Sequence, residues 1–273
     1  MIAGASVAGR LAGKVAIVTG GTQGLGEAIA RGFIDAGASV MVVGIDARGG
    51  VSLAESLGPA GRFIETDVTD DDQIDRAVAA TLEVFGRLDI LVNNACIYED
   101  RGLASTREQW RRLLDVNLVS AAIFAGKSSK HISGGGVIIN LGSTGGKFGA
   151  VGRALYPASK AALQQLTRSL AVELAPSNIR VVTVSPAWTW SPSLEHLANG
   201  SLETADRVGK MFHPLGRVGR SHEIAQVIAF LCSSDASWIT GVDIPVDGGF
   251  SVLGPDQGIS PRDWFGRLAE DDA

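Results

Sequence analysis

Residues 14–26 read KVAIVTGGTQGLG, and this stretch decides the fold of the 273-residue chain. The first six residues form a short apolar run rich in β-branched side chains, which predicts a buried strand. A glycine-rich turn follows at Gly20–Gly26, and residues 27–36 then carry apolar side chains at helical spacing. A nucleotide site requires this order of strand, glycine turn and helix. Glycines let the backbone approach a phosphate, and the helix N-terminus offers free N–H groups. The spacing differs from the G-x-G-x-x-G dinucleotide pattern, so the turn by itself indicates only a phosphate ligand.

Apolar runs and amphipathic stretches alternate along the rest of the chain. We expect further strands at residues 40–43, 63–65, 89–92, 136–141, 181–184 and 242–246, and further helices at residues 70–85, 106–130, 154–174 and 224–231. Repeated β–α alternation predicts an α/β fold with a single Rossmann-type, doubly wound parallel sheet flanked by helices. A chain of 273 residues is expected to form one such domain.

Tyr156 and Lys160 form a candidate catalytic pair. Four residues apart on an expected helix, the two side chains project from the same face. An ammonium group beside a phenol favours phenolate, so we expect Lys160 to lower the Tyr156 pKa and make this tyrosine a general acid or base. The only other tyrosine, Tyr98, has Gly102 at the same offset and lacks such a partner.

Composition restricts the class of protein. A net charge of −5 gives no reason to expect a nucleic-acid partner. Cys96 and Cys232 are too few for a disulfide framework, each is expected to be a small buried hydrophobe, and the four histidines form no ligand set, so no metal is expected. The N-terminal residues 1–13 lack a signal-peptide core, and no segment is long and apolar enough to span a membrane. We therefore expect a cytoplasmic protein.

The chain resembles the short-chain dehydrogenase/reductase family over residues 11–250. The glycine motif of the family is matched by Thr19-Gly20-x-x-x-Gly24-x-Gly26, and its adenine-contacting acid by Asp67-Val68. Its N-N-A-G motif stands here as Asn93-Asn94-Ala95-Cys96, with cysteine in place of the last glycine.

The resemblance implies a complete catalytic set of Asn117, Ser143, Tyr156 and Lys160. In the family, Ser143 would hold the substrate oxygen and Tyr156 would transfer the proton. Lys160 would lower the Tyr156 pKa and hold the nicotinamide ribose, and Asn117 would position a water of the proton relay. The implied cofactor-binding residues are Gly20, Gln23, Gly24, Leu25, Gly26, Asp46, Asp67, Val68, Asn94, Ala95, Cys96, Tyr156, Lys160, Thr189 and Ser191.

Cofactor preference depends on the end of the second strand. An acid there accepts bonds from the adenosine ribose, whereas a basic residue pairs with a 2′-phosphate. Asp46 is the candidate acid, although it is also read as a solvated turn residue, while Gln23 and Ile45 stand where a basic residue would favour NADP. The nearby basic residue Arg48 leaves NADP as an alternative cofactor. The sequence favours NAD over NADP.

The resemblance places a variable substrate lid at residues 187–215 and a C-terminal extension at residues 251–273. Substrate-binding candidates are Ser143, Tyr156, Trp188 and Trp190. The two tryptophans indicate an apolar or aromatic small-molecule substrate, or else they pack the lid against the body. In the extension, Trp264 and Phe265 could anchor the chain on a neighbouring subunit.

These observations predict an NAD(P)-dependent oxidoreductase that interconverts a secondary alcohol and a ketone. Two alternatives stay open: a 3-oxoacyl-thioester reductase, and a non-catalytic dinucleotide-binding sensor or scaffold. The family's usual packing also implies a homotetramer, in which the helices at residues 106–130 and 154–174 pair across subunits. Small residues of the second helix, Ala161, Ala162 and Ala171, would permit close approach.

Overall fold

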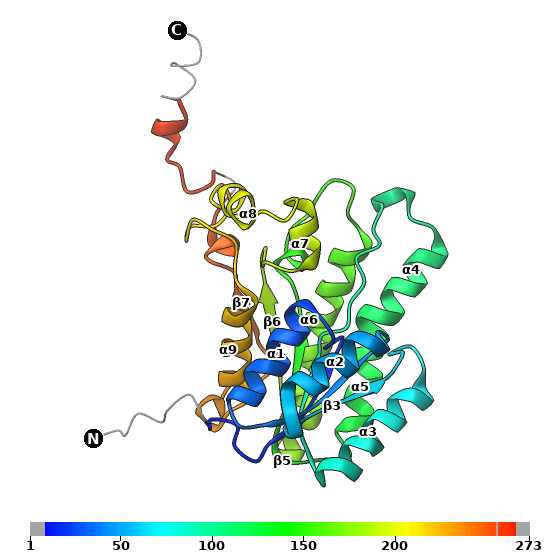
Figure 1. The fold of residues 1–273 in the computed structure, drawn as a ribbon. Helices are drawn as coiled ribbons and strands as arrows, with labels where there is room; N and C mark the ends of the chain where they lie inside the picture. The colour runs from blue at the N-terminus through cyan, green and yellow to red at the C-terminus, as the bar shows by residue number, and fades with distance from the viewer. Residues whose placement is uncertain (1–8, 255, 266–273) are drawn as a thin grey trace, which may run out of the picture.

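The computed structural model describes residues 9–254 and 256–265, in which strands and helices alternate (Figure 1). The strands are β1 (Val15–Thr19), β2 (Ser39–Gly44), β3 (Gly61–Glu65), β4 (Leu88–Asn93), β5 (Ile132–Leu141), β6 (Arg180–Pro186) and β7 (Asp243–Val246). The helices are α1 (Gly24–Asp35), α2 (Ala47–Leu57), α3 (Asp71–Phe85), α4 (Arg107–Leu114), α5 (Ser120–Ser128), α6 (Leu155–Leu174), α7 (Pro192–Leu197), α8 (Leu202–Gly209) and α9 (Ser221–Leu231).

Within the described residues the strands form one seven-stranded sheet in the order β3-β2-β1-β4-β5-β6-β7. Every neighbouring pair is parallel, which confirms the fold class predicted from the alternating pattern. A parallel sheet must be covered on both faces, and all five residues of β1 are accordingly buried.

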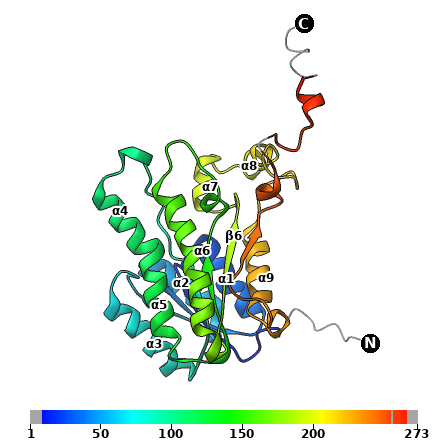
Figure 2. The same ribbon diagram turned by 180° about the vertical axis from the view of Figure 1, so that it is seen from behind.

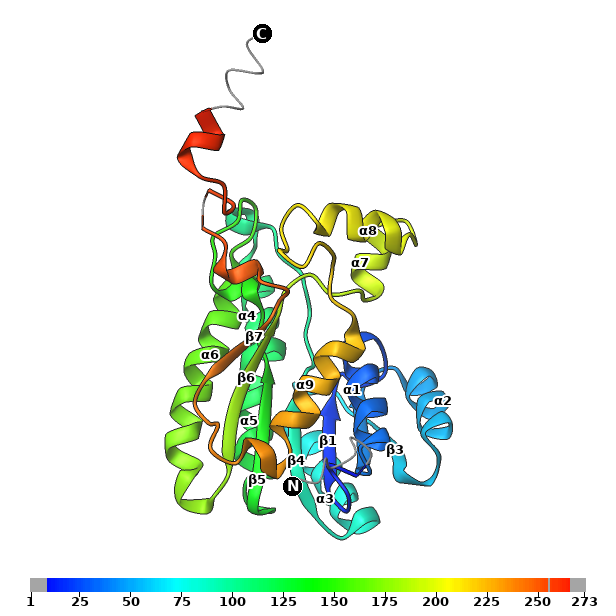
Figure 3. The same cartoon turned by 90° about the vertical axis from the view of Figure 1, so that its left-hand side faces the viewer.

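Alternate residues of β1 face two separate halves of the core. Ala16 and Val18 pack in one apolar cluster with residues of α1, α2 and α9, whereas Ile17 packs in a second cluster with residues of α3, α5 and α6. Figure 3 shows these two helical layers on opposite sides of the sheet, and Figure 2 shows α4, α5 and α6 from behind. The period-2 alternation of side chains along a strand produces this division.

The strand order reverses between β1 and β4, because the chain builds outward from β1 to β3 and then returns. Ligands on such sheets bind in the crevice beyond the carboxyl ends of the strands at this reversal. The glycine-rich turn follows β1, and Asn94–Cys96 follow β4. The fold therefore brings two of the predicted motifs together.

Three helical features differ from the sequence-based expectations. Helix α2 occupies a stretch for which no helix was expected, and α7 and α8 lie in the proposed lid. The single helix expected at residues 106–130 is divided, because a π-helical segment at Asp115–Val119 separates α4 from α5. π-bulges of this kind are frequent at functional sites, and this one contains Asn117.

The described part of the C-terminal extension runs away from the sheet (Figure 1). Within it, the Trp264 indole donates a hydrogen bond of 3.1 Å to the carbonyl of Asp256, and Phe265 is exposed. The first eight residues and the acidic residues 270–272 lie outside the described residues. Among the described helices, none combines the length and apolar character needed to cross a membrane.

Candidate active site

The glycine-rich turn is packed so tightly that side chains would not fit. Gly20 has a φ of +59°, and a Cβ there would lie 2.8 Å from the Cα of Ala95. A Cβ on Gly26 would lie 2.2 Å from the carbonyl oxygen of Gly20. Helix α1 begins at Gly24, and its N-cap residue Gln23 makes no side-chain capping bond. This bare helix N-terminus and its glycine cradle fit the pyrophosphate of a dinucleotide.

Asn94 ties the end of β4 to the turn. Its Nδ2 donates hydrogen bonds of 2.9 Å to the carbonyls of both Thr19 and Gly20. The backbone N–H groups of Asn94 and Ala95 in turn donate to Thr19 Oγ1, at 3.0 and 3.1 Å. Both residues therefore adjoin the glycine turn, as the cofactor-binding prediction requires. Cys96, next in the chain, is a free cysteine, and it lines a cavity that also contains Tyr156 and Lys160.

Tyr156 and Lys160 lie on the same face of α6, and both side chains are buried, with exposed fractions of 8% and 3%. The Lys160 Nζ lies 5.6 Å from the centre of the Tyr156 ring and donates a 2.7 Å hydrogen bond to the carbonyl of Leu141. Ser143 follows β5, and its Oγ accepts a hydrogen bond of 3.0 Å from the N–H of Gly145. The structure thus brings together three of the four predicted catalytic side chains.

The pKa of Tyr156 differs from the expectation. Burial raises this pKa above its usual value, because the protein interior disfavours the phenolate. The Lys160 ammonium, a hydrogen bond with Ser143 and the Arg153 guanidinium oppose the increase, yet the pKa remains raised in the protein alone. The predicted effect of Lys160 is therefore present, but burial exceeds it.

Asn117 is buried, and it is not among the residues that line the cavity containing Ser143, Tyr156 and Lys160. Its Oδ1 accepts a 2.8 Å hydrogen bond from the N–H of Ile97, and its Nδ2 donates to the carbonyl of Ile97 at 3.0 Å and to Ser159 Oγ at 3.4 Å. The side chain thus joins the segment after β4 to α6. Its predicted part in a proton relay stays a prediction.

Asp100 fixes the start of α6 and was missed from the sequence. Its carboxylate accepts hydrogen bonds of 2.9–3.0 Å from the N–H groups of Gly102, Ala154 and Tyr156. Burial acts to raise the pKa of Asp100, but the bonds from Ala154, Tyr156 and Gly102 hold it below the usual range. Asp100 therefore helps to position the backbone of Tyr156. A lone acid 56 residues from Tyr156 carries no local signal of this contact.

A cavity of about 590 Å³ lies beyond the carboxyl ends of the central strands. The predicted residues that line it are Leu25, Asn94, Cys96, Ser143, Tyr156, Lys160, Trp188, Thr189 and Ser191. Other lining residues were missed from the sequence, among them Tyr98 and Arg153. The Tyr98 ring stacks on Tyr156 at 5.1 Å between centres, and the Arg153 guanidinium carbon lies 5.4 Å from the centre of the Tyr156 ring.

The predicted adenosine contacts lie apart from this cavity. Asp67 is exposed after β3, and its Oδ1 accepts hydrogen bonds from the N–H and hydroxyl groups of Thr69 at 2.9 and 2.8 Å. Val68 is buried beside it. Asp46 is the N-cap of α2 and accepts a 3.0 Å hydrogen bond from the N–H of Gly49, so it is not merely a solvated turn residue.

The two tryptophans of the lid have different surroundings. Trp188 lines the cavity and packs on Phe212, with 5.1 Å between ring centres. Trp190 is absent from the cavity lining and packs with Ala198, Ala205 and Val218. Of the two proposed substrate contacts, the structure therefore leaves Trp188 at the cavity and gives Trp190 a packing position within the lid.

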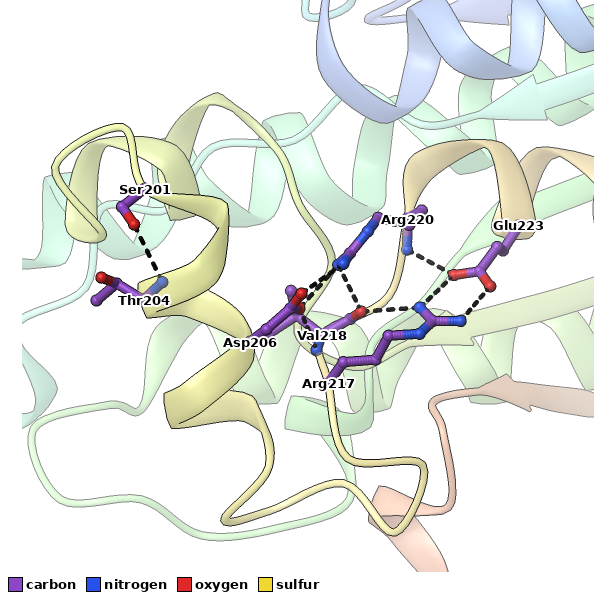
Figure 4. Close-up of polar contacts among 7 residues, drawn as sticks. All are labelled: Ser201, Thr204, Asp206, Arg217, Val218, Arg220 and Glu223. Carbon is purple, nitrogen blue, oxygen red and sulfur yellow. Dashed lines mark hydrogen bonds and ion pairs between the residues drawn. The ribbon is translucent and has the colours of Figure 1, made fainter.

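Ion pairs tie the lid to α9 (Figure 4). Asp206 of α8 pairs with Arg220 at 2.6 Å, and Arg217 pairs with Glu223 of α9 at 2.6 Å. Chiefly through its hydrogen bond, Arg217 lowers the pKa of Glu223 to about 2. These pairs hold α8 beside the start of α9 in the structure described here.

The chain is similar to known oxidoreductases over most of its length. A family model described as enoyl-(acyl carrier protein) reductase matches residues 20–251. A Thermotoga maritima protein named as an uncharacterized oxidoreductase is 38% identical over 249 residues, which cover 89% of this chain and 97% of the relative. The cis-4-hydroxycyclohexanecarboxylate dehydrogenase of Sinomonas cyclohexanicum is 37% identical over 248 residues, covering 88% of this chain and 97% of that enzyme.

A crystal structure from Brucella melitensis is similar in three dimensions. It is described as a short-chain dehydrogenase/reductase of the glucose/ribitol dehydrogenase type, and it matches with a TM-score of 0.82 at 34% sequence identity. The match covers 88% of this chain and 98% of that chain.

Proposed function

Because the chain belongs to the short-chain dehydrogenase/reductase family, we propose that this oxidoreductase interconverts a secondary alcohol and a ketone by NAD(P)-dependent hydride transfer. One observation carries the proposal: Ser143, Tyr156 and Lys160 line a single cavity that adjoins the glycine cradle. The family as a whole uses NAD(P), and the cradle formed by Gly20 and Gly26 fits such a cofactor. The enzyme class rests on the family, whereas the reaction is our inference.

Each side chain at the cavity has a distinct part in this proposal. The dinucleotide, when bound, supplies the acceptor or donor of the hydride. Ser143 would hold the substrate oxygen, and Tyr156 would take the alcohol proton or return it. Lys160 would hold the nicotinamide ribose and favour the phenolate of Tyr156, because its ammonium opposes the effect of burial.

The walls of the cavity favour an apolar ring substrate. Trp188, Phe148, Leu194 and Leu197 are among its lining residues, and small-molecule sites are mostly lined by such apolar side chains. The Sinomonas relative is named for a ring alcohol, which supports a cyclic secondary alcohol here as well.

Absorbance of the reduced dinucleotide tests the proposal. The purified chain is mixed with NAD or NADP and a panel of ring and open-chain secondary alcohols, and the reverse direction is tested with the matching ketones. We expect turnover with at least one alcohol–ketone pair. Binding of dinucleotide without any turnover across the panel would instead support the sensor or scaffold.

A 3-oxoacyl-thioester reductase is the second candidate. The description of the matching family model, which names an acyl carrier protein, favours it. Gln23 and Ile45 weigh against it, because neither offers the positive charge that such NADPH-dependent enzymes generally use. Comparing a 3-oxoacyl thioester with the ring ketones in the same assay separates the two reactions.

We propose NAD as the preferred cofactor. Ile45 is 74% exposed immediately after β2 and supplies no charge for a 2′-phosphate, whereas Asp46 presents a carboxylate at the start of α2. A phosphate that carries nearly two negative charges would be repelled by that carboxylate. Arg48, in the first turn of α2, is the feature that favours NADP.

Replacing Asp46 with asparagine is expected to narrow the preference for NAD. Asparagine caps a helix about as well as aspartate, so the substitution removes the charge and keeps the bond to Gly49. Charge-assisted bonds contribute about 1.5–3 kcal/mol, which predicts a shift of roughly ten- to a hundredfold in the NAD/NADP ratio of kcat/KM. Ile45→Arg should shift the ratio further toward NADP, since its guanidinium matches a phosphate.

Asp35→Asn provides the control for this prediction, because Asp35 is an exposed acid at the far end of α1. It should leave the cofactor ratio unchanged. An unchanged ratio in Asp46→Asn as well would show that Asp46 serves only as the cap of α2.

We further propose a homotetramer. The helices expected to pair are α4, α5 and α6, with Ala161 exposed and Ala162 half-buried on α6. Ala171 does not fit the prediction, since it is buried within the chain next to Gly241. A second interface is favoured by the edge strand β7 and by the nearby Trp238, which is 97% exposed.

Light scattering at micromolar concentration is expected to return about four times the chain mass of 28.3 kDa, because two symmetric interfaces close into a tetramer. A single-chain mass would contradict the assembly. Trp238→Glu should reduce the mass to that of a dimer, because a charge at the second interface would be buried without a partner.

A further inference from the structure

Arg153 supplies a positive charge to the active-site cavity. Its guanidinium carbon lies 5.4 Å from the centre of the Tyr156 ring, and its side chain is exposed where it lines the cavity. Among the described residues, no carboxylate forms an ion pair with Arg153. The nearby Asp100 carboxylate is occupied by backbone N–H groups. The Arg153 guanidinium therefore has no carboxylate partner among the described residues and can pair with an anionic ligand.

The backbone on both sides of Arg153 is held in place. On one side, the N–H of Arg153 donates a 3.2 Å hydrogen bond to the carbonyl of Ala150, which closes a turn through Gly152. On the other side, Asp100 holds the N–H of Ala154. The Arg153 side chain thus starts from a fixed backbone position three residues before Tyr156, and its guanidinium lies over the Tyr156 ring.

The charges that face the cavity have one sign. Lys160 and Arg153 are its cationic lining residues, and no aspartate or glutamate lines it within the described part of the chain. The Lys160 ammonium donates a hydrogen bond to the carbonyl of Leu141 and lies over the Tyr156 ring. An anion that enters the cavity would therefore meet Arg153 unopposed.

We propose that Arg153 binds a carboxylate on the substrate, so that the alcohol oxidised here is a hydroxy-carboxylate with an apolar ring or chain. This inference rests on the proposed function, because it assigns the substrate of the same site. The planar guanidinium pairs with a carboxylate through two parallel hydrogen bonds. The apolar wall at Trp188 receives the carbon skeleton.

Tyr98 is another polar residue of the same cavity. It lines the cavity, and its ring stacks on Tyr156 with an angle of 28° between the ring planes. The Tyr98 hydroxyl is protonated at neutral pH, as for any phenol with an ordinary pKa, and can donate a hydrogen bond. Tyr98 thus adds a hydrogen-bond donor to the cavity in which Arg153 supplies the positive charge.

Arg153 could alternatively serve only Tyr156, by lowering the pKa of that phenol. The two roles of Arg153 predict different effects on neutral and anionic substrates. A group that acts only on Tyr156 changes the turnover of neutral and anionic alcohols by the same factor. A carboxylate-binding group changes their ratio.

The test compares cyclohexanol with the hydroxycyclohexanecarboxylate isomers and the matching carboxamides, using parent protein, Arg153→Met and Arg153→Lys. The readout is the carboxylate-to-neutral ratio of kcat/KM. We expect Arg153→Met to lower this ratio by about ten- to a hundredfold, mainly through KM, and Arg153→Lys to restore part of it. Arg168→Met, on the outer face of α6 where Arg168 bonds Gln165, should leave the ratio unchanged.

Calorimetry provides a second readout that needs no turnover. Cyclohexanecarboxylate, which cannot be oxidised at a carbinol, should bind the protein–dinucleotide complex, whereas cyclohexanecarboxamide should bind more weakly. Arg153→Met should remove the difference between them. An absence of turnover with every alcohol would overturn the proposed function and leave this binding result to judge the inference. Equal binding of carboxylate and carboxamide by the parent, or an unchanged kcat/KM ratio in Arg153→Met, would overturn the inference alone.

Discussion

Tyr156→Phe is expected to lower kcat by about 10²–10⁴-fold, the range that general acid–base catalysis supplies. The substitution removes the hydroxyl that carries the proton and leaves the ring to pack in its buried position against Tyr98. Lys160 keeps its bond to Leu141, so dinucleotide binding should persist. The measurements are steady-state kcat and the dissociation constant of the dinucleotide.

The chain's other tyrosine offers a matched control for this prediction. Tyr98→Phe also removes one phenolic hydroxyl from the cavity but retains the stacked ring. Its effect should fall mainly on KM and remain below about tenfold in kcat, since a neutral hydrogen bond contributes about 0.5–1.5 kcal/mol. Turnover by Tyr156→Phe within about tenfold of the parent would show that Tyr156 is not the acid or base.

Gly26→Ala is expected to weaken dinucleotide binding by roughly a hundredfold, with a loss of about 1–3 kcal/mol in unfolding free energy from overpacking. The added Cβ would lie 2.2 Å from the carbonyl oxygen of Gly20 and 2.6 Å from Asn94 Nδ2. Neither group can move without disturbing the end of β1 or the hydrogen bonds that hold the turn. Dinucleotide titration and chemical denaturation measure the two effects.

Gly126→Ala is the matched control, because Gly126 lies within α5 and an added Cβ there would meet no atom within 4 Å. Alanine is the better helix former by about 1 kcal/mol, so stability should stay equal or increase while dinucleotide binding is unchanged. Equal binding by Gly26→Ala and the parent would show that the turn is not the pyrophosphate site.

The sequence predicted the sheet well because buried parallel strands are continuous apolar runs. It predicted the helices less well where local and tertiary signals disagree. Helix α2 was missed since Gly49 and Gly50 lower helix propensity, whereas in the structure the Asp46 cap starts the helix and Leu53 and Leu57 bury its apolar side.

Tertiary contacts also explain the division of the helix expected at residues 106–130. The π-helical segment coincides with the bonds from Asn117 to Ile97, which lies 20 residues away in sequence. A pattern of apolar residues along one helix carries no information about such a partner. The break could not be read from the sequence alone.

At the site, residues with a fixed spacing were predictable, and residues that depend on loop paths were not. Ser143, Tyr156 and Lys160 follow a recognisable pattern and meet at one cavity. Asp100 and Arg153 belong to loops whose paths are set by backbone hydrogen bonds, so neither was identified. For the same reason the sequence could not separate Trp188, at the cavity, from Trp190, inside the lid.

The most direct test of the central claim follows the hydrogen that leaves the carbinol carbon. The best secondary alcohol of the panel is prepared with deuterium on that carbon, and both products are analysed by mass spectrometry. Hydride transfer predicts deuterium in the reduced dinucleotide in an amount equal to the ketone formed. Ketone without deuterium in the dinucleotide, or a bound dinucleotide that no alcohol reduces, would contradict the assignment of this chain as an alcohol dehydrogenase or ketone reductase.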